Sequence, residues 1–384
     1  MSSPANTPEK IIIISPAFPY RGGIAATSDR LAKEYGNRNV DIEIWTYKML
    51  YPKIIFPGKS QLLDLDKHSA PEEITIHRKI SSINPFNWIK VGKQLKKVNA
   101  SKVIVRYWLP FLGPCLGTII RFAKNGKTKF VGLIDNVVPH ESRMGDKMLS
   151  RYFYKRLDGF LVMSKKGIGQ LTEIFKVDKQ ITYSPHPLFD IYGDVVEKTA
   201  ACKHLKLDAN LNYVLSFGLI RKYKGIDLLI IAFKSFSENH PNHRLLIVGE
   251  CYDDWKIYQA QIDQLKLNDK IIRFDSFIAD DQVKYYFSAA DFLALTYHTA
   301  TQSGITQIAY SMELPILVTD VGDLATMVPD GKVGRVVKPE NTDAITNAMV
   351  EMIQPDNLKL YREGIAEEKK RFEWSVLCDN LDQF

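Results

Sequence analysis

The stretch "YVLSFGLIRKYKGIDLLIIAF", Tyr213–Phe233, joins two apolar runs through a loop that is rich in glycine and cations. The first run is typical of a short buried strand, and the second has the length of a helix. A strand, a loop and a helix in this order form the repeating unit of a parallel α/β sheet. We therefore expect the loop to lie at the carboxyl end of a strand, the edge at which such sheets bind ligands.

The same alternation of strand and helix runs along most of the chain. In the C-terminal half, further strands are expected in "RLLIVG", "IIRFDSF", "DFLALT" and "PILVTD", which begin at Arg244, Ile271, Asp291 and Pro315. In the N-terminal half, β-branched runs predict strands at Ile11–Ile14, Ile42–Thr46, Lys102–Val105, Phe130–Ile134 and Gly159–Val162. A less regular stretch near residues 185–212 separates the halves. The pattern predicts an α/β protein with two doubly wound domains, and an amphipathic C-terminal segment that packs back across their junction.

The composition is that of a globular protein with a mild positive charge. A chain of 384 residues is long enough for two domains of roughly 150–200 residues each. The net charge of +7 would suit an anionic ligand, a membrane surface or nucleic acid, and it is too small to choose among them. The 4 cysteines form no CxxC pair, which argues against a zinc cluster or a disulfide framework. The first apolar run is too short for a signal peptide, and no stretch approaches the ~18 apolar residues of a membrane span, so we expect a cytoplasmic protein.

Two loops that follow strands carry groups suited to phosphate. Gly22 and Gly23 precede a helix whose first amide groups could face a phosphate or a hydroxyl, although a glycine pair can also form a simple tight turn. Arg221, Lys222 and Lys224 fall within four residues before the second helix. Arginine supplies a planar fork and lysine a mobile charge, so this loop suits a diphosphate better than it suits an ordinary solvated turn.

A third loop, "YHTATQSG", begins at Tyr297 and leads into a helix with an apolar face. Thr301 or Ser303 can cap that helix, and the amide groups near Ser303–Ile305 could then hold anionic oxygens. A cap without a ligand is the simpler alternative. If the Arg221–Lys224 loop and this loop follow neighbouring strands, they would surround one diphosphate.

The order and spacing of these blocks resemble the GT-B glycosyltransferases of the retaining group called family 4, or group 1. The resemblance covers nearly the whole chain and rests on "GGIA", "FGLIRKYKGIDLLI", "LLIVGE", "IIRFDSFIADDQVKYYFSAADFLALT", "LPILVTDVGDLATMV" and "DGKVGRVVKPENTDAI". Within the family, the chain is most similar to bacterial surface-polysaccharide transferases with a "TQSG" loop, whose N-terminal blocks resemble "RYWLPFLGP" and "NVVPHE".

The resemblance implies two Rossmann-like domains that face each other across a cleft. Residues 1–190, with the C-terminal helix at about 370–384, would bind the acceptor, and residues 191–369 would bind a nucleotide sugar. Lys224 matches a contact to the phosphates of the sugar donor. The arginine of the family usually directly follows the glycine, where this chain has Leu219, so Arg221 is a substitute for it. Phe277 and Ile278 match a stretch that lies against the nucleotide base through backbone contacts.

One departure from the family concerns acids. Many members have two glutamates separated by seven residues, one at the donor sugar and one at the ribose. Here the corresponding positions are Thr301 and Ala309, or Ala300 and Ile308, depending on the alignment, and neither alignment restores an acid. Glu313 comes too late and is better explained as a solvated residue at the end of the helix.

The reaction implied by the resemblance tolerates this loss, because a retaining transferase of this kind is thought to need no protein nucleophile. The departing diphosphate itself can take the proton of the acceptor while the protein neutralises the leaving group. Neutral side chains of the third loop would then bind the sugar hydroxyls. The residues expected at the nucleotide sugar are Gly22, Gly23, Arg221, Lys224, Phe277, Ile278, Thr301, Gln302, Ser303, Gly304 and Ile305.

Candidate catalytic residues also follow a strand of the N-terminal half. Asp135 stands where the family often has a histidine that approaches the donor sugar, and His140 and Glu141 follow closely. Asp135 could accept hydrogen bonds from sugar or acceptor hydroxyls, and His140 with Glu141 could move a proton. Alternatively, Asp135 and Asn136 only shape the loop, and the histidine is structural.

Two segments of the N-terminal half mix apolar and basic residues, namely "NPFNWIKVGKQLKKVNASK" from Asn84 and "RMGDKMLSRYFYKRLD" from Arg143. Such helices suit an anionic membrane surface and hence a lipid-linked acceptor, although they can also be ordinary amphipathic helices. No nucleic-acid-binding motif accompanies the charge.

The sequence thus predicts a retaining glycosyltransferase that moves a hexose-type sugar from a nucleoside-diphosphate sugar to a glycan or lipid-linked glycan, in bacterial surface polysaccharide biosynthesis. No metal or other cofactor is expected. Two alternatives stay open: a nucleotide-sugar epimerase or sugar-phosphate synthase of the same fold, and a non-catalytic nucleotide-sugar-binding subunit, which the absent glutamates would suit.

Overall fold

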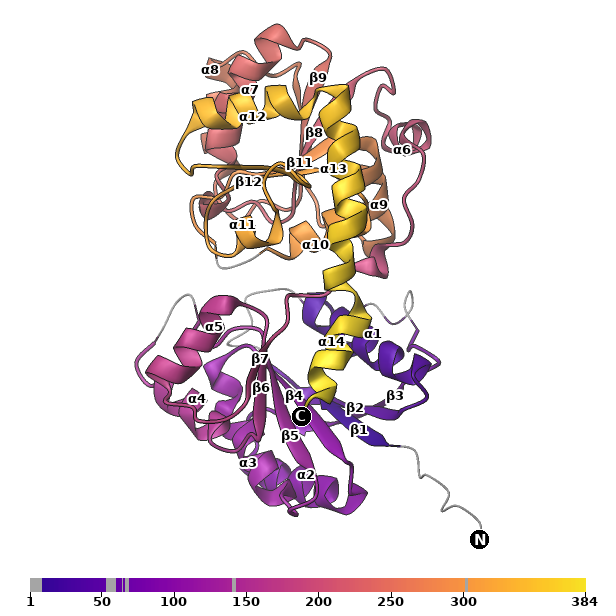
Figure 1. The fold of residues 1–384 in the computed structure, drawn as a ribbon, viewed down its shortest axis with the longest axis vertical. Helices are drawn as coiled ribbons and strands as arrows, with labels where there is room; N and C mark the ends of the chain where they lie inside the picture. The colour runs from indigo at the N-terminus through magenta and orange to yellow at the C-terminus, as the bar shows by residue number, and fades with distance from the viewer. Residues whose placement is uncertain (1–8, 53–59, 64, 66–68, 140–142, 301–302) are drawn as a thin grey trace. The chain divides into compact units, whose positions relative to one another are not determined.

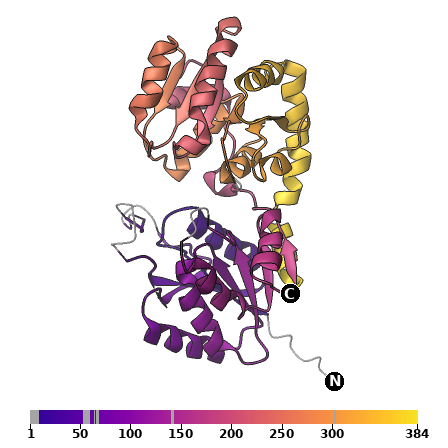
Figure 2. The ribbon, with the colours of Figure 1, turned by 90° about the vertical axis from the view of Figure 1, so that its left-hand side faces the viewer.

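The computed structural model describes residues 9–52, 60–63, 65, 69–139, 143–300 and 303–384. The chain forms two compact units (Figure 1). The N-terminal unit comprises Met1–Pro185 together with Trp374–Phe384, and the C-terminal unit comprises His186–Glu373. Each unit has its own parallel sheet with helices on both faces (Figure 2). No helix in these described ranges combines the length and apolar character that crossing a bilayer requires.

The N-terminal unit contains a seven-stranded sheet in the order β3-β2-β1-β4-β5-β6-β7. Its strands are β1 (Lys10–Ile14), β2 (Asp41–Met49), β3 (Thr75–Ser81), β4 (Lys102–Tyr107), β5 (Lys129–Ile134), β6 (Gly159–Val162) and β7 (Ile181–Tyr183). The helices are α1 (Gly23–Asn37), α2 (Pro85–Val98), α3 (Gly113–Ala123), α4 (Asp146–Tyr154), α5 (Lys165–Gly169) and α14 (Trp374–Asp382), with short η turns at Pro110–Leu112 and Gln170–Ile174.

Strand β1 shows why this sheet is covered on both faces. Its isoleucines are all buried, and successive side chains point to opposite faces of the sheet. Ile12 and Ile14 pack into the core that includes α2, α3 and α4, whereas Ile11 and Ile13 pack into the core of α1 and α14. The chain therefore needs its last helix to cover one face of its first sheet.

Helix α14 is bound to this face by polar contacts as well. The hydroxyl of Tyr35 donates to Asp382 over 2.9 Å, and the buried ammonium of Lys102 lies 3.0 Å from the same carboxylate. Arg38 pairs with Asp379 over 2.7 Å. The predicted return of the C-terminal segment to the N-terminal domain is confirmed.

The C-terminal unit contains a six-stranded parallel sheet in the order β10-β9-β8-β11-β12-β13. Its strands are β8 (Asn212–Phe217), β9 (His243–Val248), β10 (Ile271–Phe274), β11 (Phe292–Leu295), β12 (Ile316–Thr319) and β13 (Gly334–Val337). Its helices are α6 (Lys198–Leu205), α7 (Ile226–Asn239), α8 (Trp255–Gln264), α9 (Asp280–Ala289), α10 (Gly304–Ser311), α11 (Leu324–Met327), α12 (Thr342–Met352) and α13 (Pro355–Glu368), with η turns at Asp190–Tyr192, Lys222–Lys224 and Lys369–Phe372. The predicted fold class, two Rossmann-like parallel sheets, is confirmed.

The strand order of the second sheet reverses direction between β8 and β11, which is where sheets of this type leave room for a ligand. The loops after these two strands touch at Gly225, whose φ of +61° lies in the left-handed region. The hydroxyl of Thr296 donates to the Gly225 carbonyl over 2.8 Å, and a Cβ at Gly225 would lie 2.0 Å from the Thr296 carbonyl oxygen. Glycine at this position allows the backbones of the two loops to approach closely enough for this hydrogen bond.

Candidate active site

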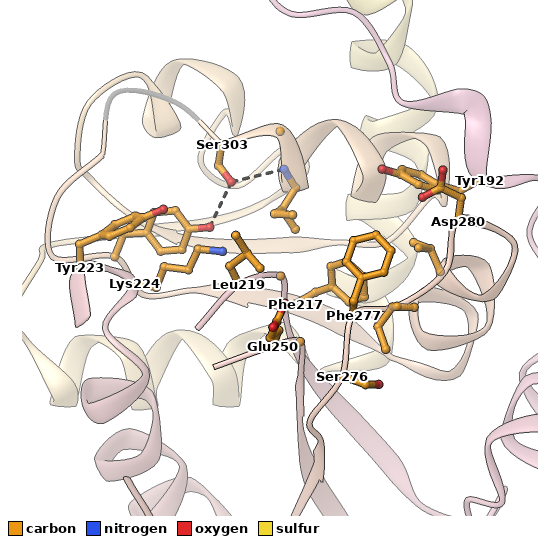
Figure 3. Close-up of a pocket in the computed structure, with 17 residues that line it drawn as sticks. Tyr192, Phe217, Leu219, Tyr223, Lys224, Glu250, Ser276, Phe277, Asp280 and Ser303 are labelled. Atoms are coloured by element: carbon orange, nitrogen blue, oxygen red, sulfur yellow. Dashed lines mark hydrogen bonds between the residues drawn. The ribbon is translucent and has the colours of Figure 1, made fainter. Parts of the chain in front are cut away.

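A pocket of about 380 Å³ opens at the carboxyl edge of the second sheet and lies wholly within the C-terminal unit (Figure 3). The loops after β8 and β11 supply one end of it, and the stretch between β10 and α9 supplies the other. It brings together six of the residues that the sequence singled out: Lys224, Phe277, Ile278, Ser303, Gly304 and Ile305. These residues are distant in the sequence, so their convergence is a property of the fold.

Lys224 is the buried cation of this pocket. Its side chain is 9% exposed, and its Nζ lies 5.7 Å from the centre of the Tyr297 ring. Within the described residues, the ammonium forms no ion pair and no hydrogen bond. Burial, and secondarily the nearby Arg221 guanidinium, lower the pKa of Lys224 to about 8. A buried ammonium without a carboxylate partner is costly, and an anionic ligand would relieve that cost.

Arg221 and Lys222 belong to the same loop but are exposed. The guanidinium of Arg221 lies over the ring of Tyr252, 5.1 Å from its centre, and does not line the pocket. Of these three clustered cations, only Lys224 lines the pocket.

The N-terminus of α10 forms the wall opposite Lys224. Ser303 caps this helix, because its Oγ accepts a hydrogen bond from the Ile305 amide over 3.3 Å and lies 3.1 Å from the hydroxyl of Tyr297 (Figure 3). The sequence of α10, "GITQIAYS", contains no acid. A helix N-terminus beside a buried ammonium can hold an anion such as a diphosphate. The predicted contacts Thr301 and Gln302 lie outside the described residues.

His298 fastens the loop after β11 to its surroundings. Its Nε2 lies 3.0 Å from a carboxylate oxygen of Asp227, its Nδ1 contacts Glu340, and its amide donates to the Tyr223 carbonyl. Partial burial lowers the pKa of His298, but the hydrogen bonds to Glu340 and Asp227 outweigh this effect and raise the pKa above its usual value. The ring and amide of His298 therefore connect the loop after β11 to α7, to Glu340 and to the turn that carries Tyr223 and Lys224.

Several pocket residues were missed by the sequence analysis. Tyr192 lies in the less regular stretch between the two halves of the sequence, and Glu250 directly follows the glycine after β9. Asp280 opens α9, two residues after Ile278, and its nearness to that predicted contact was the available signal.

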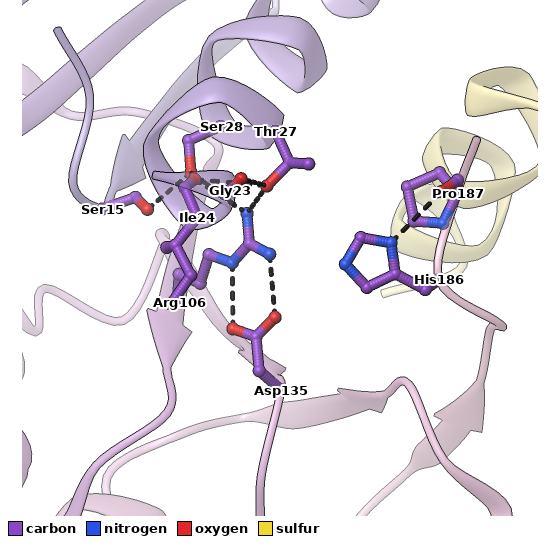
Figure 4. Close-up of polar contacts among 9 residues, drawn as sticks. All are labelled: Ser15, Gly23, Ile24, Thr27, Ser28, Arg106, Asp135, His186 and Pro187. Carbon is purple, nitrogen blue, oxygen red and sulfur yellow. Dashed lines mark hydrogen bonds and ion pairs between the residues drawn. The ribbon is translucent and has the colours of Figure 1, made fainter. Parts of the chain in front are cut away.

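The predicted catalytic residue Asp135 lies in the N-terminal unit, at the end of β5. Its two carboxylate oxygens accept hydrogen bonds from Nε and Nη2 of Arg106, over 2.9 and 2.8 Å (Figure 4). Arg106 is 2% exposed, and its Nη1 also donates to Thr27 and Ser28 on α1. This bidentate pairing argues against a role for Asp135 as a proton-accepting base, although its remaining lone pairs can still accept a hydroxyl.

The other site residues predicted in the N-terminal unit are His140, Glu141, Gly22 and Gly23. His140 and Glu141 lie outside the described residues. Gly22 has a φ of +104° and precedes α1, which begins at Gly23 without a side-chain cap. Both glycines belong to the N-terminal unit, whereas the pocket described above is built from the C-terminal unit. Among the residues that the structure describes, no three histidine, cysteine or carboxylate side chains gather as a metal site would require.

Residues 197–371 match the family model described as glycosyl transferases group 1. The chain is a glycosyltransferase, and this region is its group 1 domain. An uncharacterized glycosyltransferase from Methanocaldococcus jannaschii is 22% identical over 370 residues, which cover 95% of this chain and 94% of the relative. The capsular polysaccharide biosynthesis glycosyltransferase CapM from Staphylococcus aureus is 23% identical over 176 residues, which cover 45% of this glycosyltransferase and 46% of CapM.

The fold of this glycosyltransferase is shared with solved structures. The crystal structure of Anabaena HepE in complex with UDP superposes with a TM-score of 0.72 at 14% identity, covering 98% of this chain and 100% of HepE. At this identity the similarity establishes the fold alone, and it confirms the GT-B architecture expected from the sequence.

Proposed function

We propose that this glycosyltransferase moves a hexose from a nucleoside-diphosphate sugar to a glycan acceptor with retention of the anomeric configuration. The observation that carries the proposal is the buried Lys224 ammonium, which faces the pocket without an acidic partner among the described residues. The UDP bound by the structural neighbour HepE supports a nucleotide ligand.

The diphosphate would lie between Lys224 and the first amides of α10. A Cβ at Gly218 would lie 3.0 Å from the Lys224 Nζ and 3.2 Å from the Ile305 side chain, so the glycine keeps this space open. A buried cation and a helix dipole stabilise the negative charge that develops on a leaving diphosphate. Gly304 and Ser303, at the start of the same helix, are placed to contribute polar contacts.

The retaining step needs no acid on α10. In a front-side displacement the bond between the anomeric carbon and the diphosphate oxygen breaks, the acceptor oxygen bonds to the same face, and the departing diphosphate takes the acceptor proton. Lys224 and the α10 amides then hold the product diphosphate. Thr301, Gln302 and Ser303 would replace the family's glutamates as neutral partners of the sugar hydroxyls.

The proposed acceptor is a lipid-linked glycan at the cytoplasmic face of a membrane. Helices α2, α3 and α4 pack side by side in the N-terminal unit and carry one acid, Asp146. The large apolar side chains Phe86 and Met148 are 85% and 70% exposed on this surface. The exposed cations of the three helices are Lys90, Lys93, Lys96, Lys97, Arg121, Lys147 and Arg151. Exposed apolar groups among cations suit an anionic lipid surface, and CapM's named role supports a polysaccharide product.

A transfer assay tests the proposal. The purified protein would be incubated with a panel of nucleotide sugars, with and without a bacterial lipid extract, while released nucleoside diphosphate is measured. We expect release that depends on the extract, and a product linkage with the anomeric configuration of the donor by NMR. Conversion of the sugar without an acceptor would favour an epimerase instead, and an inverted linkage would refute retention.

A further inference from the structure

Tyr223 lines the same end of the pocket as Lys224. The centre of its ring is 5.8 Å from that of Tyr297, in an edge-to-face arrangement, and the Lys224 ammonium lies 5.7 Å from the same Tyr297 ring. Tyr297 is 3% exposed, and its hydroxyl lies 3.1 Å from the Ser303 Oγ at the start of α10. One buried ring therefore supports Tyr223 beside both groups that we assign to the diphosphate.

The rest of the pocket extends from Lys224 in the direction away from Tyr223. Residues after β9 and β10, including Glu250 and Phe277, line the pocket on the other side of Lys224 (Figure 3). In a nucleotide sugar, the nucleoside and the sugar are attached to opposite ends of the diphosphate. The nucleoside is the larger group and finds its room on the Phe277 side, so the sugar is directed toward Tyr223.

The ring of Tyr223 is chemically suited to a sugar. Its side chain lines the pocket and is still 43% exposed, so part of its aromatic surface is free to be covered. The face of an aromatic ring carries partial negative charge. The axial C–H bonds on one face of a pyranose carry partial positive charge, because the ring carbons are bonded to oxygen. Stacking of the two faces also buries apolar surface.

We propose that Tyr223 is a donor-sugar contact, on whose ring the transferred pyranose stacks a face of C–H bonds. This inference rests on the proposed function, because it assumes that the pocket binds a nucleotide sugar with its diphosphate at Lys224. Stacking supplies affinity for the sugar without a carboxylate, which suits a pocket whose helix α10 contains no acid.

Tyr252 offers a matched control for the role of Tyr223. It is a tyrosine of similar exposure, 53%, in the loop after β9, and it does not line the pocket. If exposed aromatic surface at this edge of the sheet acted only in a general way, loss of either ring would have the same effect on sugar binding.

Calorimetric titration of the full chain tests the assignment. The nucleoside diphosphate that binds most tightly among UDP, GDP and ADP is compared with the corresponding nucleoside-diphosphate glucose, and the ratio of the two affinities is the readout. Tyr223→Ala should lower the affinity for the nucleotide glucose about tenfold relative to that for the free nucleoside diphosphate, because only the sugar loses a contact. Tyr223→Phe, which keeps the ring, and Tyr252→Ala should both retain the wild-type ratio.

An unchanged ratio in Tyr223→Ala, even with both ligands weakened equally, would overturn the stacking assignment and leave the proposed function standing. A ratio as low in Tyr223→Phe as in Tyr223→Ala would also overturn it, because the hydroxyl and not the ring would then make the contact. Absence of binding by all the nucleotides would remove both the assignment and the proposed nucleotide site. Affinity for the free nucleoside diphosphate shows in each variant that the pocket is folded.

Discussion

Lys224 is the side chain on which the phosphate end of the pocket depends. Lys224→Ala should weaken binding of the preferred nucleoside diphosphate at least about tenfold, the scale of one lost charge-assisted contact. Lys222→Ala is the matched control, because Lys222 lies in the same η turn, carries the same charge and is exposed. Calorimetry should show less than about a threefold change for this variant. Equal losses in the two variants would mean that only the general charge of the loop matters.

The lowered pKa of Lys224, about 8, predicts a pH dependence of binding. Below this pH the ammonium is charged and binds phosphate, and above it the free protein loses the proton. Affinity for a nucleoside diphosphate should therefore be flat near pH 7 and fall as the pH rises through 8, by at most about tenfold per unit.

Two variants separate Lys224 from other titrating groups in that experiment. Arg221→Gln removes a nearby positive charge that lowers the pKa of Lys224, so the fall should move to higher pH. Lys224→Met should bind weakly at every pH, without the fall. A fall of the same size in Lys224→Met would assign the titration to another residue.

The part of the pocket around Lys224 and Ser303 could be predicted from the sequence, whereas the part around Tyr192 could not. Lys224 and Ser303 lie in the connections that follow β8 and β11, and the carboxyl ends of parallel strands meet at one edge. Tyr192 reaches the pocket from a connecting segment without regular periodicity, so only the tertiary structure identifies it. The pairing of Arg106 with Asp135 joins residues on neighbouring strands and was likewise invisible in the sequence.

At the scale of elements, the contact between the loops after β8 and β11 is sterically tight. Gly225→Ala would both force a side chain into the left-handed region and drive a Cβ into the Thr296 carbonyl. We expect a loss of at least about 2 kcal/mol of unfolding free energy, measured by urea unfolding. Gly331→Ala separates the two causes, because Gly331 has a φ of +73° but no heavy atom within 4 Å of the position that an alanine methyl group would take.

Gly331→Ala should cost only about 1 kcal/mol, the conformational part alone. Equal costs in the two glycine variants would show that the close approach to Thr296 contributes nothing to stability.

The central strands of both sheets were predicted, and the strands that were missed, β3, β7 and β13, all lie at sheet edges. An edge strand is short or partly solvated and lacks the continuous apolar run of a central strand. The sequence of β3, "TIHRKIS", alternates with polar residues, and β7 has three residues, all partly exposed. The apolar pattern of the sequence therefore identified the buried central strands of each sheet but missed three of the strands at the edges.

At the scale of the whole molecule, the basic surface of α2, α3 and α4 predicts binding to anionic membranes. Lys93→Glu with Lys97→Glu should reduce sedimentation with phosphatidylglycerol vesicles at least about tenfold, because each cation near such a surface contributes about 1 kcal/mol. Lys256→Glu with Lys359→Glu makes the same change in net charge on exposed residues of the C-terminal unit, and should leave vesicle binding unchanged. Equal losses of vesicle binding in the two double variants would show that binding depends only on the net charge of the protein.

Transfer at the Lys224 pocket is the central claim, and acceptor-dependent release of nucleoside diphosphate tests it most directly. The wild-type protein, given its preferred nucleotide sugar and a bacterial lipid extract, should release nucleoside diphosphate, and Lys224→Ala should release at least about a hundredfold less. Lys222→Ala should retain activity close to that of the wild type. Tight binding of the nucleotide sugar by the wild-type protein without release, or full activity in Lys224→Ala, would contradict the account.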